Sequence, residues 1–366
     1  MAAPNFRTVR YARAWLAGPK GFVEQEMSLD RQGTSVPATL TRPRRESGRL
    51  PAWVVLHGVT RRGRAHEQLT RFTRTIVSTG AVAIVPEVPE WRDFRLAPRL
   101  AAPTVKAAIA GLRDSGWARD APVGVIGFSF GAPHAIAATA HPDIREEVAG
   151  SVAFGGYCSL TSTVRFLMTG EHEWRGKTHR LAPDAYGRWI VAVNYLTAVP
   201  GNESADGVTA ALRALCAEAG DHGLPATHPR LESLKSELRT RLAEEHRALF
   251  DLFAPVGASL PERAPASDAA EQLAAAARRL EPDVEPVRAL AEVGLPVHVL
   301  HGRHDNLIPY SEGLRLAECL PDRSRSRVTI TRLFGHSGQG SLLSLAGTLG
   351  ELPSFLAALR GVLRLV

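Results

Sequence analysis

The chain has 366 residues, of which 45% are hydrophobic, and its 44 basic and 37 acidic side chains give a net charge of +7. This length and apolar content are enough for one large domain or two modest ones with a substantial core, and they exclude a mostly disordered chain. The unbroken apolar runs are far shorter than the roughly 18 to 20 residues that a membrane-spanning helix needs. We therefore expect a globular protein without a membrane span.

The basic excess does not predict nucleic-acid binding. Four of the 44 basic residues are Lys, which leaves 40 Arg, and these alternate with Ala, Leu and Glu without a stripe of interleaved aromatic residues. Three cysteines without C-x-x-C spacing argue against a disulfide framework and a thiolate metal site, and favour a reducing compartment. Arg and Lys interrupt the apolar residues of 1–22, so no secretory signal is expected and a cytoplasmic location follows.

The first predicted elements are strands at 22–29 and 35–41, and the turn sequence between them makes an antiparallel hairpin. Five short, continuous apolar runs follow, a pattern typical of strands that are buried on both faces of a parallel sheet. A later run alternates apolar and polar residues and predicts a strand nearer an edge. The five buried runs are 52–56, 81–85, 123–128, 151–154 and 296–300, and the alternating run is 327–333.

Helical patterns separate these strands. Apolar residues recur at helical spacing from Leu69 to Val77, and Pro103 begins a second helix that ends before Gly116. A final helical pattern covers 341–365 and is broken near Gly350. Alternating strands and helices predict an α/β fold with a doubly wound, mostly parallel sheet.

The alternation stops between residues 158 and 293, where strand-like runs give way to segments rich in Ala, Leu, Glu and Arg. We interpret this stretch as a helical cap inserted into a core made of 1–157 and 294–366. Its helices are predicted over 184–197, 205–219, 229–253 and 267–280. Its aromatic residues either line a substrate pocket or pack the cap onto the core; these are Trp174, Tyr186, Trp189 and Tyr195.

The buried run at 123–128 leads directly into a G-x-S-x-G motif centred on Ser129. A helical pattern begins within two residues, and Pro133 falls in its first turn, where the missing N–H costs nothing. So sharp a strand-to-helix turn needs glycine on both sides, here Gly127 and Gly131, and it holds the serine hydroxyl clear of the sheet. The alternative is a purely structural glycine-rich turn.

A serine hydroxyl needs a neighbouring base and a third group that orients this base. Downstream of Ser129, Asp305 lies in the loop after the strand at 296–300, and His336 lies in a glycine-bounded loop after the strand at 327–333. The order along the chain is therefore Ser, Asp, His.

With these motifs the chain resembles the α/β-hydrolase superfamily over residues 22–157 and 294–366. The resemblance implies that Ser129 is the nucleophile, Asp305 the orienting acid and His336 the general base. It also implies an oxyanion hole formed by the backbone N–H groups of Phe130 and of Val59, which follows the pair His57-Gly58. Thr60 is a further side-chain contributor in this interpretation.

Different roles for several of these residues are open. His304 is next to Asp305 and is an alternative base, and His301, His304 and Asp305 form an alternative metal site, although their spacing matches no standard zinc signature. His134 is expected to pack or to lie at the surface. Three arginines after the oxyanion loop favour either an anionic substrate or a solvated loop; they are Arg61, Arg62 and Arg64.

The sequence therefore predicts a serine hydrolase that cleaves a carboxylic ester or a related acyl bond of a small-molecule substrate through an acyl-enzyme. No cofactor or metal is expected. One alternative is an acyltransferase that uses the same three residues, and another is a non-catalytic binding protein with this fold. The fold hosts many chemistries, so the resemblance does not choose the substrate.

Overall fold

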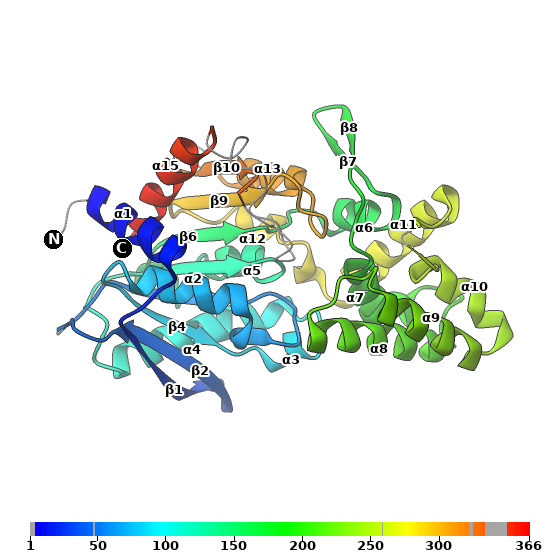
Figure 1. Cartoon of the computed structure of the whole chain (residues 1–366), viewed down its shortest axis with the longest axis horizontal. Coiled ribbons are helices and arrows are strands. Elements are labelled where there is room, and N and C mark those ends of the chain that lie inside the picture. The colour runs from blue at the N-terminus through cyan, green and yellow to red at the C-terminus, as the bar shows by residue number, and fades with distance from the viewer. Residues whose placement is uncertain (1–3, 47, 258, 322–324, 334–349) are drawn as a thin grey trace.

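An eight-stranded sheet forms the centre of the computed structural model, which describes residues 4–46, 48–257, 259–321, 325–333 and 350–366 (Figure 1). The strand order is β1-β2-β4-β3-β5-β6-β9-β10, and only β2 runs antiparallel to its neighbours. The strands are β1 (Phe22–Arg31), β2 (Thr34–Pro43), β3 (Ala52–Leu56), β4 (Val82–Pro86), β5 (Val123–Phe128), β6 (Val148–Phe154), β9 (Val297–Gly302) and β10 (Arg327–Thr331). The mostly parallel α/β sheet and its N-terminal hairpin confirm the predicted fold class.

Helices cover both faces of the sheet, which explains why its central strands are apolar on both sides. Along β3, Trp53 and Val55 belong to one buried cluster, whereas Val54 and Leu56 belong to another. The first cluster includes residues of α1, α2 and α15, and the second includes residues of α4. These helices are α1 (Pro4–Ala17), α2 (Glu67–Val77), α4 (Ala101–Asp114) and α15 (Leu352–Leu363). The part of the predicted 341–365 helix before residue 350 lies outside the described residues.

Helix α1 was not predicted from the sequence. Its Tyr11 is buried, with its ring 6.2 Å from that of Phe72 of α2, and the Arg7 guanidinium donates hydrogen bonds to the carbonyls of Leu363 and Val366, both at 2.7 Å. Helix α1 therefore packs against α15, near the C-terminal end of the described chain (Figure 1). Arginines interrupt the apolar residues of this segment in the sequence, which concealed the helix, although the Arg7 side chain itself turns toward α15.

The segment 158–293 lies beside the sheet in Figure 1, coloured green to yellow, and we call it the insertion. Its main helices are α6 (Leu160–Thr169), α7 (Ala185–Tyr195), α8 (Asp206–His222), α9 (Pro229–Arg241), α10 (Glu244–Phe253) and α11 (Arg263–Leu280). Two predictions for it were wrong. Strands are present, as the hairpin β7 (Glu171–Trp174) and β8 (Lys177–Arg180), and the expected helix over 229–253 is interrupted at Leu242 and Ala243.

The insertion has a packed interior of its own. Trp189 is fully buried, and its Nε1–H donates to the carbonyl of Phe253 at 2.9 Å. The same carbonyl accepts a hydrogen bond from Arg188 Nε at 2.7 Å. Tyr195 is also buried, whereas Trp174 is half-buried on the β7–β8 hairpin and lines a surface pocket together with residues of α13 (Tyr310–Cys319) and β10. For Trp189 and Tyr195 the structure favours the packing interpretation.

Candidate active site

Ser129 occupies the turn between β5 and α5 (Gly131–Ala138), as the motif predicts. Its φ angle is +53°, in the left-handed region that a side chain with a Cβ rarely adopts. Two backbone hydrogen bonds hold this conformation: Ser129 N–H donates to the Phe154 carbonyl at 2.8 Å, and the Ser129 carbonyl accepts from Ala132 N–H at 2.9 Å. The side chain is half-buried, and the strained backbone identifies this turn as a candidate functional position.

The glycines around Ser129 are required by close backbone approach. A Cβ on Gly127 would lie 2.4 Å from the carbonyl oxygen of Gly131, and one on Gly131 would lie 2.3 Å from the carbonyl oxygen of His57. A Cβ on Gly58 would lie 2.8 Å from Ser129 Cβ and 3.4 Å from Ser129 Oγ. The loop after β3 therefore passes directly against the serine, where the predicted oxyanion donors are needed.

His57 fixes the orientation of this loop. Its side chain is buried, and Nδ1 lies 2.6 Å from the Gly58 carbonyl oxygen, so Nδ1–H is the donor. This carbonyl belongs to the same planar peptide unit as the N–H of Val59, and in a trans peptide the two groups point in opposite directions. By holding the carbonyl on its own side, His57 turns the Val59 N–H away from itself.

Glu87 contacts the side chain of His57 and was not predicted from the sequence as a residue of this site. It is buried directly after β4, and its Oε1 lies 2.9 Å from His57 Nε2, which is also 3.0 Å from the Val88 nitrogen. Oε2 of Glu87 lies 3.6 Å from Arg64 Nε and 3.6 Å from Arg92. The sequence could have indicated Glu87, because it is an acidic residue at the carboxyl end of a predicted buried parallel strand.

Phe130 is the residue before the first turn of α5, where backbone N–H groups have no partner within the helix. In the part of the chain that the structure describes, neither Phe130 N–H nor Val59 N–H makes a backbone hydrogen bond. The Phe130 ring is buried edge-on against Trp91 at 5.3 Å between centroids. The ring thus anchors the backbone position of the predicted donor.

Asp305 is buried three residues after the end of β9. Its Oδ1 accepts hydrogen bonds from the backbone N–H groups of Leu307 at 3.0 Å and Ile308 at 2.9 Å, and its Oδ2 lies 3.5 Å from His301 Nε2. These contacts fix the rotation of the carboxylate. The neighbouring His304 is exposed, so the side chains of these adjacent residues point to different environments. This arrangement favours Asp305 over His304 as the member of a catalytic set.

The local surroundings of two further histidine predictions, the alternative metal site and His134, are as follows. Among the described residues, no group of three His, Cys, Asp or Glu side chains is arranged to hold a metal ion. His134 is packed inside the core, with Nε2 2.9 Å from the hydroxyl of Tyr157. Because that hydroxyl donates to the Val284 carbonyl at 2.8 Å, it accepts from His134 Nε2–H. Burial lowers the pKa of His134 to about 3, which keeps its imidazole neutral.

His336 lies in 334–349, outside the described residues, and hydrogen bonds join the described residues on either side of this range. Thr331, the last residue of β10, pairs with Gly302 of β9. Glu351, just before α15, accepts hydrogen bonds from the Thr331 hydroxyl at 2.9 Å and from Arg332 N–H at 2.6 Å. The Arg332 N–H is the main cause that lowers the pKa of Glu351. Thr331, Arg332 and Glu351, which flank this range in the sequence, therefore lie together at the carboxyl end of β10.

The insertion contacts the loops that carry these residues. Asp184 N–H donates to the carbonyl of Asn306, next to Asp305, at 2.8 Å. Near the loop after β3, Arg61 binds Asp93 at 3.2 Å and Asp221 of α8 at 3.1 Å. Arg64 is likewise paired with Glu26, whereas Arg62 is exposed. Two of the three arginines therefore have structural carboxylate partners, which weakens the interpretation that they select an anionic substrate.

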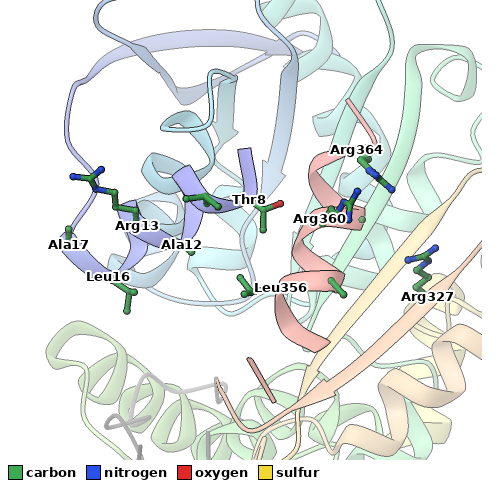
Figure 2. A pocket seen from close by; sticks show the side chains of 12 residues that line it. Thr8, Ala12, Arg13, Leu16, Ala17, Arg327, Leu356, Arg360 and Arg364 are labelled. Atoms are coloured by element: carbon green, nitrogen blue, oxygen red, sulfur yellow. The ribbon is translucent and has the colours of Figure 1, made fainter. Parts of the chain in front are cut away.

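The structure also has a surface groove, which Figure 2 shows. It has a cavity volume of about 790 Å³ and is formed by α1, α15 and the first residue of β10, Arg327. Leu16 and Leu356 contribute to its apolar wall, and Arg360 and Arg364 also line it. Arg327 is at the amino end of β10, whereas Ser129 follows the carboxyl end of β5. The groove is therefore near the opposite ends of the parallel strands from Ser129. We do not assign it to the candidate site.

Comparisons with known proteins identify the fold. No family model and no curated protein matches the sequence. Among solved structures, acylaminoacyl peptidase from Pyrococcus horikoshii is similar, with a TM-score of 0.50 and 11% identity; the match covers 93% of this chain and 42% of the peptidase, so the chain spans less than half of that protein. A fungal esterase from Rhizomucor miehei has a TM-score of 0.50 and 15% identity, over 98% of this chain and 90% of the esterase.

Similarity at these identities shows a common fold. The chain has the fold of the α/β-hydrolase superfamily, as its resemblance to that superfamily predicts. No helix among the described residues is long and apolar enough to cross a membrane.

Proposed function

We propose that this protein is a serine hydrolase that cleaves a carboxylic ester or related acyl bond of a small molecule. Ser129 is the nucleophile, His336 the general base, and Asp305 the carboxylate that orients His336. The backbone N–H groups of Val59 and Phe130 bind the oxyanion. The observation that carries the proposal is the strained φ of Ser129, +53°, in a turn against which the Gly58 loop is packed.

The reaction follows from these roles. His336 takes the hydroxyl proton as Ser129 Oγ attacks the substrate carbonyl, and Val59 and Phe130 stabilise the negative oxygen of the tetrahedral intermediate. The intermediate collapses to an acyl-enzyme as His336 gives the proton to the leaving group. Water, deprotonated by His336, then releases the acid and restores Ser129. His57 contributes by orienting the peptide unit of Val59, so it is a positioning residue.

The strand order supports this assignment of His336. Ser129 follows β5 and the His336 segment follows β10, with β6 and β9 between them, so about three strand spacings, or roughly 14 Å, separate the two strand ends. Five residues lead from Thr331 to His336, and a chain of this length reaches at most about 17 Å. Asp305 lies between them, after β9. The segment is therefore long enough for His336 to meet both partners.

We further propose that the insertion, 158–293, acts as a cap on the core formed by 1–157 and 294–366. Its contacts with Asn306 and with Arg61 put it beside two of the loops that carry the proposed site. A cap in this position limits the size of the acyl or leaving group that reaches Ser129.

The decisive experiment is covalent labelling with a small fluorophosphonate at pH 8, followed by peptide mapping. An activated serine attacks the phosphorus, so the label should be found on Ser129, and Ser129→Ala should lose both the label and turnover of p-nitrophenyl acetate, by a factor on the order of 10⁶. Ser35→Ala, at an exposed serine of β2, is the matched control and should retain both.

Three different results would change the proposal. Absence of labelling on the folded protein would favour the non-catalytic binding protein. Label on Ser129 without hydrolysis, followed by turnover when an alcohol or thiol acceptor is added, would favour an acyltransferase. Near-normal turnover by Ser129→Ala would remove Ser129 from the reaction.

A further inference from the structure

Two of the three cysteines meet at the junction between the insertion and the core. The Sγ atoms of Cys158 and Cys319 are 2.9 Å apart, although the residues are separated by 161 positions. Cys158 is buried at the start of the insertion, and Cys319 is the half-buried last residue of α13. Both thiols are free, and an S–S bond is about 2.05 Å long. Less than 1 Å of movement would bring the two sulfurs to bonding distance.

The backbone around Cys158 is already fixed to α13. Glu312 of α13 is fully buried, and its carboxylate accepts hydrogen bonds from Cys158 N–H at 3.1 Å and Ser159 N–H at 2.8 Å. The Ser162 hydroxyl also donates to it, at 2.5 Å. These N–H groups precede or begin α6, where a carboxylate also stabilises the helix terminus. The contacts hold the two thiols together without a covalent bond.

We propose that Cys158 and Cys319 form a reversible disulfide, a redox site that fastens the first residue of the insertion to α13. The reaction partner is a low-molecular-weight disulfide such as glutathione disulfide. The Cys319 thiolate attacks one sulfur of this compound and releases one thiol, which leaves a mixed disulfide on Cys319. Cys158 then attacks the Cys319 sulfur and releases the second thiol. Two protein thiols are oxidised to one disulfide, and one external disulfide is reduced to two thiols.

The order of attack follows from access and hydrogen bonding. Cys319 is half-buried, whereas only 2% of Cys158 is exposed, so an external disulfide reaches Cys319 first. The hydrogen bond from the Cys158 thiol lowers the pKa of Cys319, which increases the fraction of reactive thiolate. Reduction reverses both steps.

The sequence expectation of no disulfide framework rested on the odd cysteine number and the absence of a close spacing. Those criteria describe small cysteine-rich domains. They do not detect a single pair of cysteines that the fold brings together from distant segments. Cys216 is the third cysteine, and it is buried in α8.

The test uses the full chain incubated with glutathione disulfide. In denaturant, the number of titratable thiols should fall from three to one, and a non-reducing digest should contain a Cys158–Cys319 linked peptide. Cys319→Ser should abolish the linked peptide, whereas the matched control Cys216→Ser should retain it. Oxidised wild type should melt higher than reduced wild type, by on the order of 5 °C, because the bond closes a long loop. Amide hydrogen exchange at Cys158 and Ser159 should slow in parallel.

Two outcomes would overturn the proposal. One is a stable glutathione adduct on Cys319 with no linked peptide after prolonged incubation. The other is the same rise in melting temperature in Cys319→Ser, which would show that the pair is not responsible. Cys158→Ser provides a second variant if Cys319→Ser fails to fold, since either substitution must remove the linked peptide. None of these measurements depends on turnover, so they separate this proposal from the proposed hydrolase function.

Discussion

The loops at the carboxyl ends of the parallel strands, which we call the edge, differ from the insertion in how their polar groups are used. At the edge, backbone groups hold the side chain of Asp305 and the backbone of Ser129, and the side chain of Ser129 stays half-buried. In the insertion, Arg188 and Trp189 are turned inward onto one carbonyl, that of Phe253. At the edge, polar groups therefore hold a strained turn and a buried carboxylate, whereas in the insertion they satisfy one another inside its own interior.

This difference indicates where substitutions should affect chemistry and where they should affect folding. The edge combines strain with fixed hydrogen bonds, which is the arrangement expected of a preorganised site. The insertion stabilises its helices by burial, so its aromatic residues act mainly through packing. Substitutions in each region therefore test one side of this contrast.

The largest expected effect is at the edge, in the adjacent residues Asp305 and His304. If Asp305 orients the base as proposed, Asp305→Asn preserves the shape of the side chain but favours the wrong tautomer of the base, so kcat on p-nitrophenyl acetate should fall on the order of 10⁴, as in known Ser-His-Asp triads. The exposed His304 is the matched neighbour, and His304→Gln should leave kcat within about threefold of wild type. The reverse order of the two losses would identify His304 as the functional residue.

In the insertion the expected effect is on stability. Trp189→Ala removes a fully buried ring and its hydrogen bond to Phe253, so the free energy of unfolding should fall by about 3 to 5 kcal/mol. Trp174→Ala, at a half-buried position of the hairpin, should cost less. Denaturant unfolding of both variants gives the comparison. If Trp189→Ala instead changed the preference for acyl-chain length at unchanged stability, the packing interpretation would be wrong.

The same contrast explains what the sequence could predict. Helices cover both faces of the sheet, so the core strands are short, continuous apolar runs. Their positions could therefore be predicted from the sequence. Ser129, Asp305 and the His57-Gly58 pair each follow such a strand, and parallel strands bring their carboxyl ends to one edge. The positions of Ser129, Asp305 and the His57-Gly58 pair at the ends of these strands could therefore be predicted from the order of the strands in the sequence. The role of His336 stays a prediction, because its segment lies outside the described residues.

Some features depend on contacts between distant parts of the chain and left no local pattern. Glu87 is defined by its contact with His57, and the thiol pair by the approach of α13 to the insertion. The β7–β8 hairpin was missed because the insertion was predicted to be helical throughout from its composition. Composition also does not give the ends of a helix, which depend on capping groups such as the Ser159 side chain at the start of α6.

The third prediction concerns acid sensitivity, which arises in the core. The pKa of the buried His134 is about 3 in the folded protein, against about 6.5 in an unfolded chain. Between these values the unfolded chain binds a proton that the folded protein does not, so stability falls as pH falls. At pH 5 the loss from His134 is about 2 kcal/mol relative to pH 7. Burial also lowers the pKa values of His172 and His298, both to about 4, which adds to the loss.

Urea unfolding at pH 7 and pH 5 measures this loss directly. His134→Gln retains a donor toward Tyr157 but cannot titrate, so its decrease in unfolding free energy between the two pH values should be about 2 kcal/mol smaller than that of wild type. His141→Gln, at an exposed histidine, is the control and should follow wild type. An unchanged decrease in His134→Gln would mean that His134 does not carry the pH dependence.

The smallest expected effect on stability isolates the backbone strain at Ser129. A non-glycine residue in the left-handed region costs about 1 to 2 kcal/mol, and glycine removes this cost but gains freedom in the unfolded chain. Ser129→Gly should therefore raise the free energy of unfolding by about 1 kcal/mol or less while it abolishes turnover. Gln32, with φ of 54° in the exposed β1–β2 turn, is the matched position. Gln32→Gly should produce a similar gain with turnover unchanged. If Ser129→Gly were destabilising while Gln32→Gly was stabilising, the side chain of Ser129 would contribute to folding, and the turn would not be a site where stability is exchanged for reactivity.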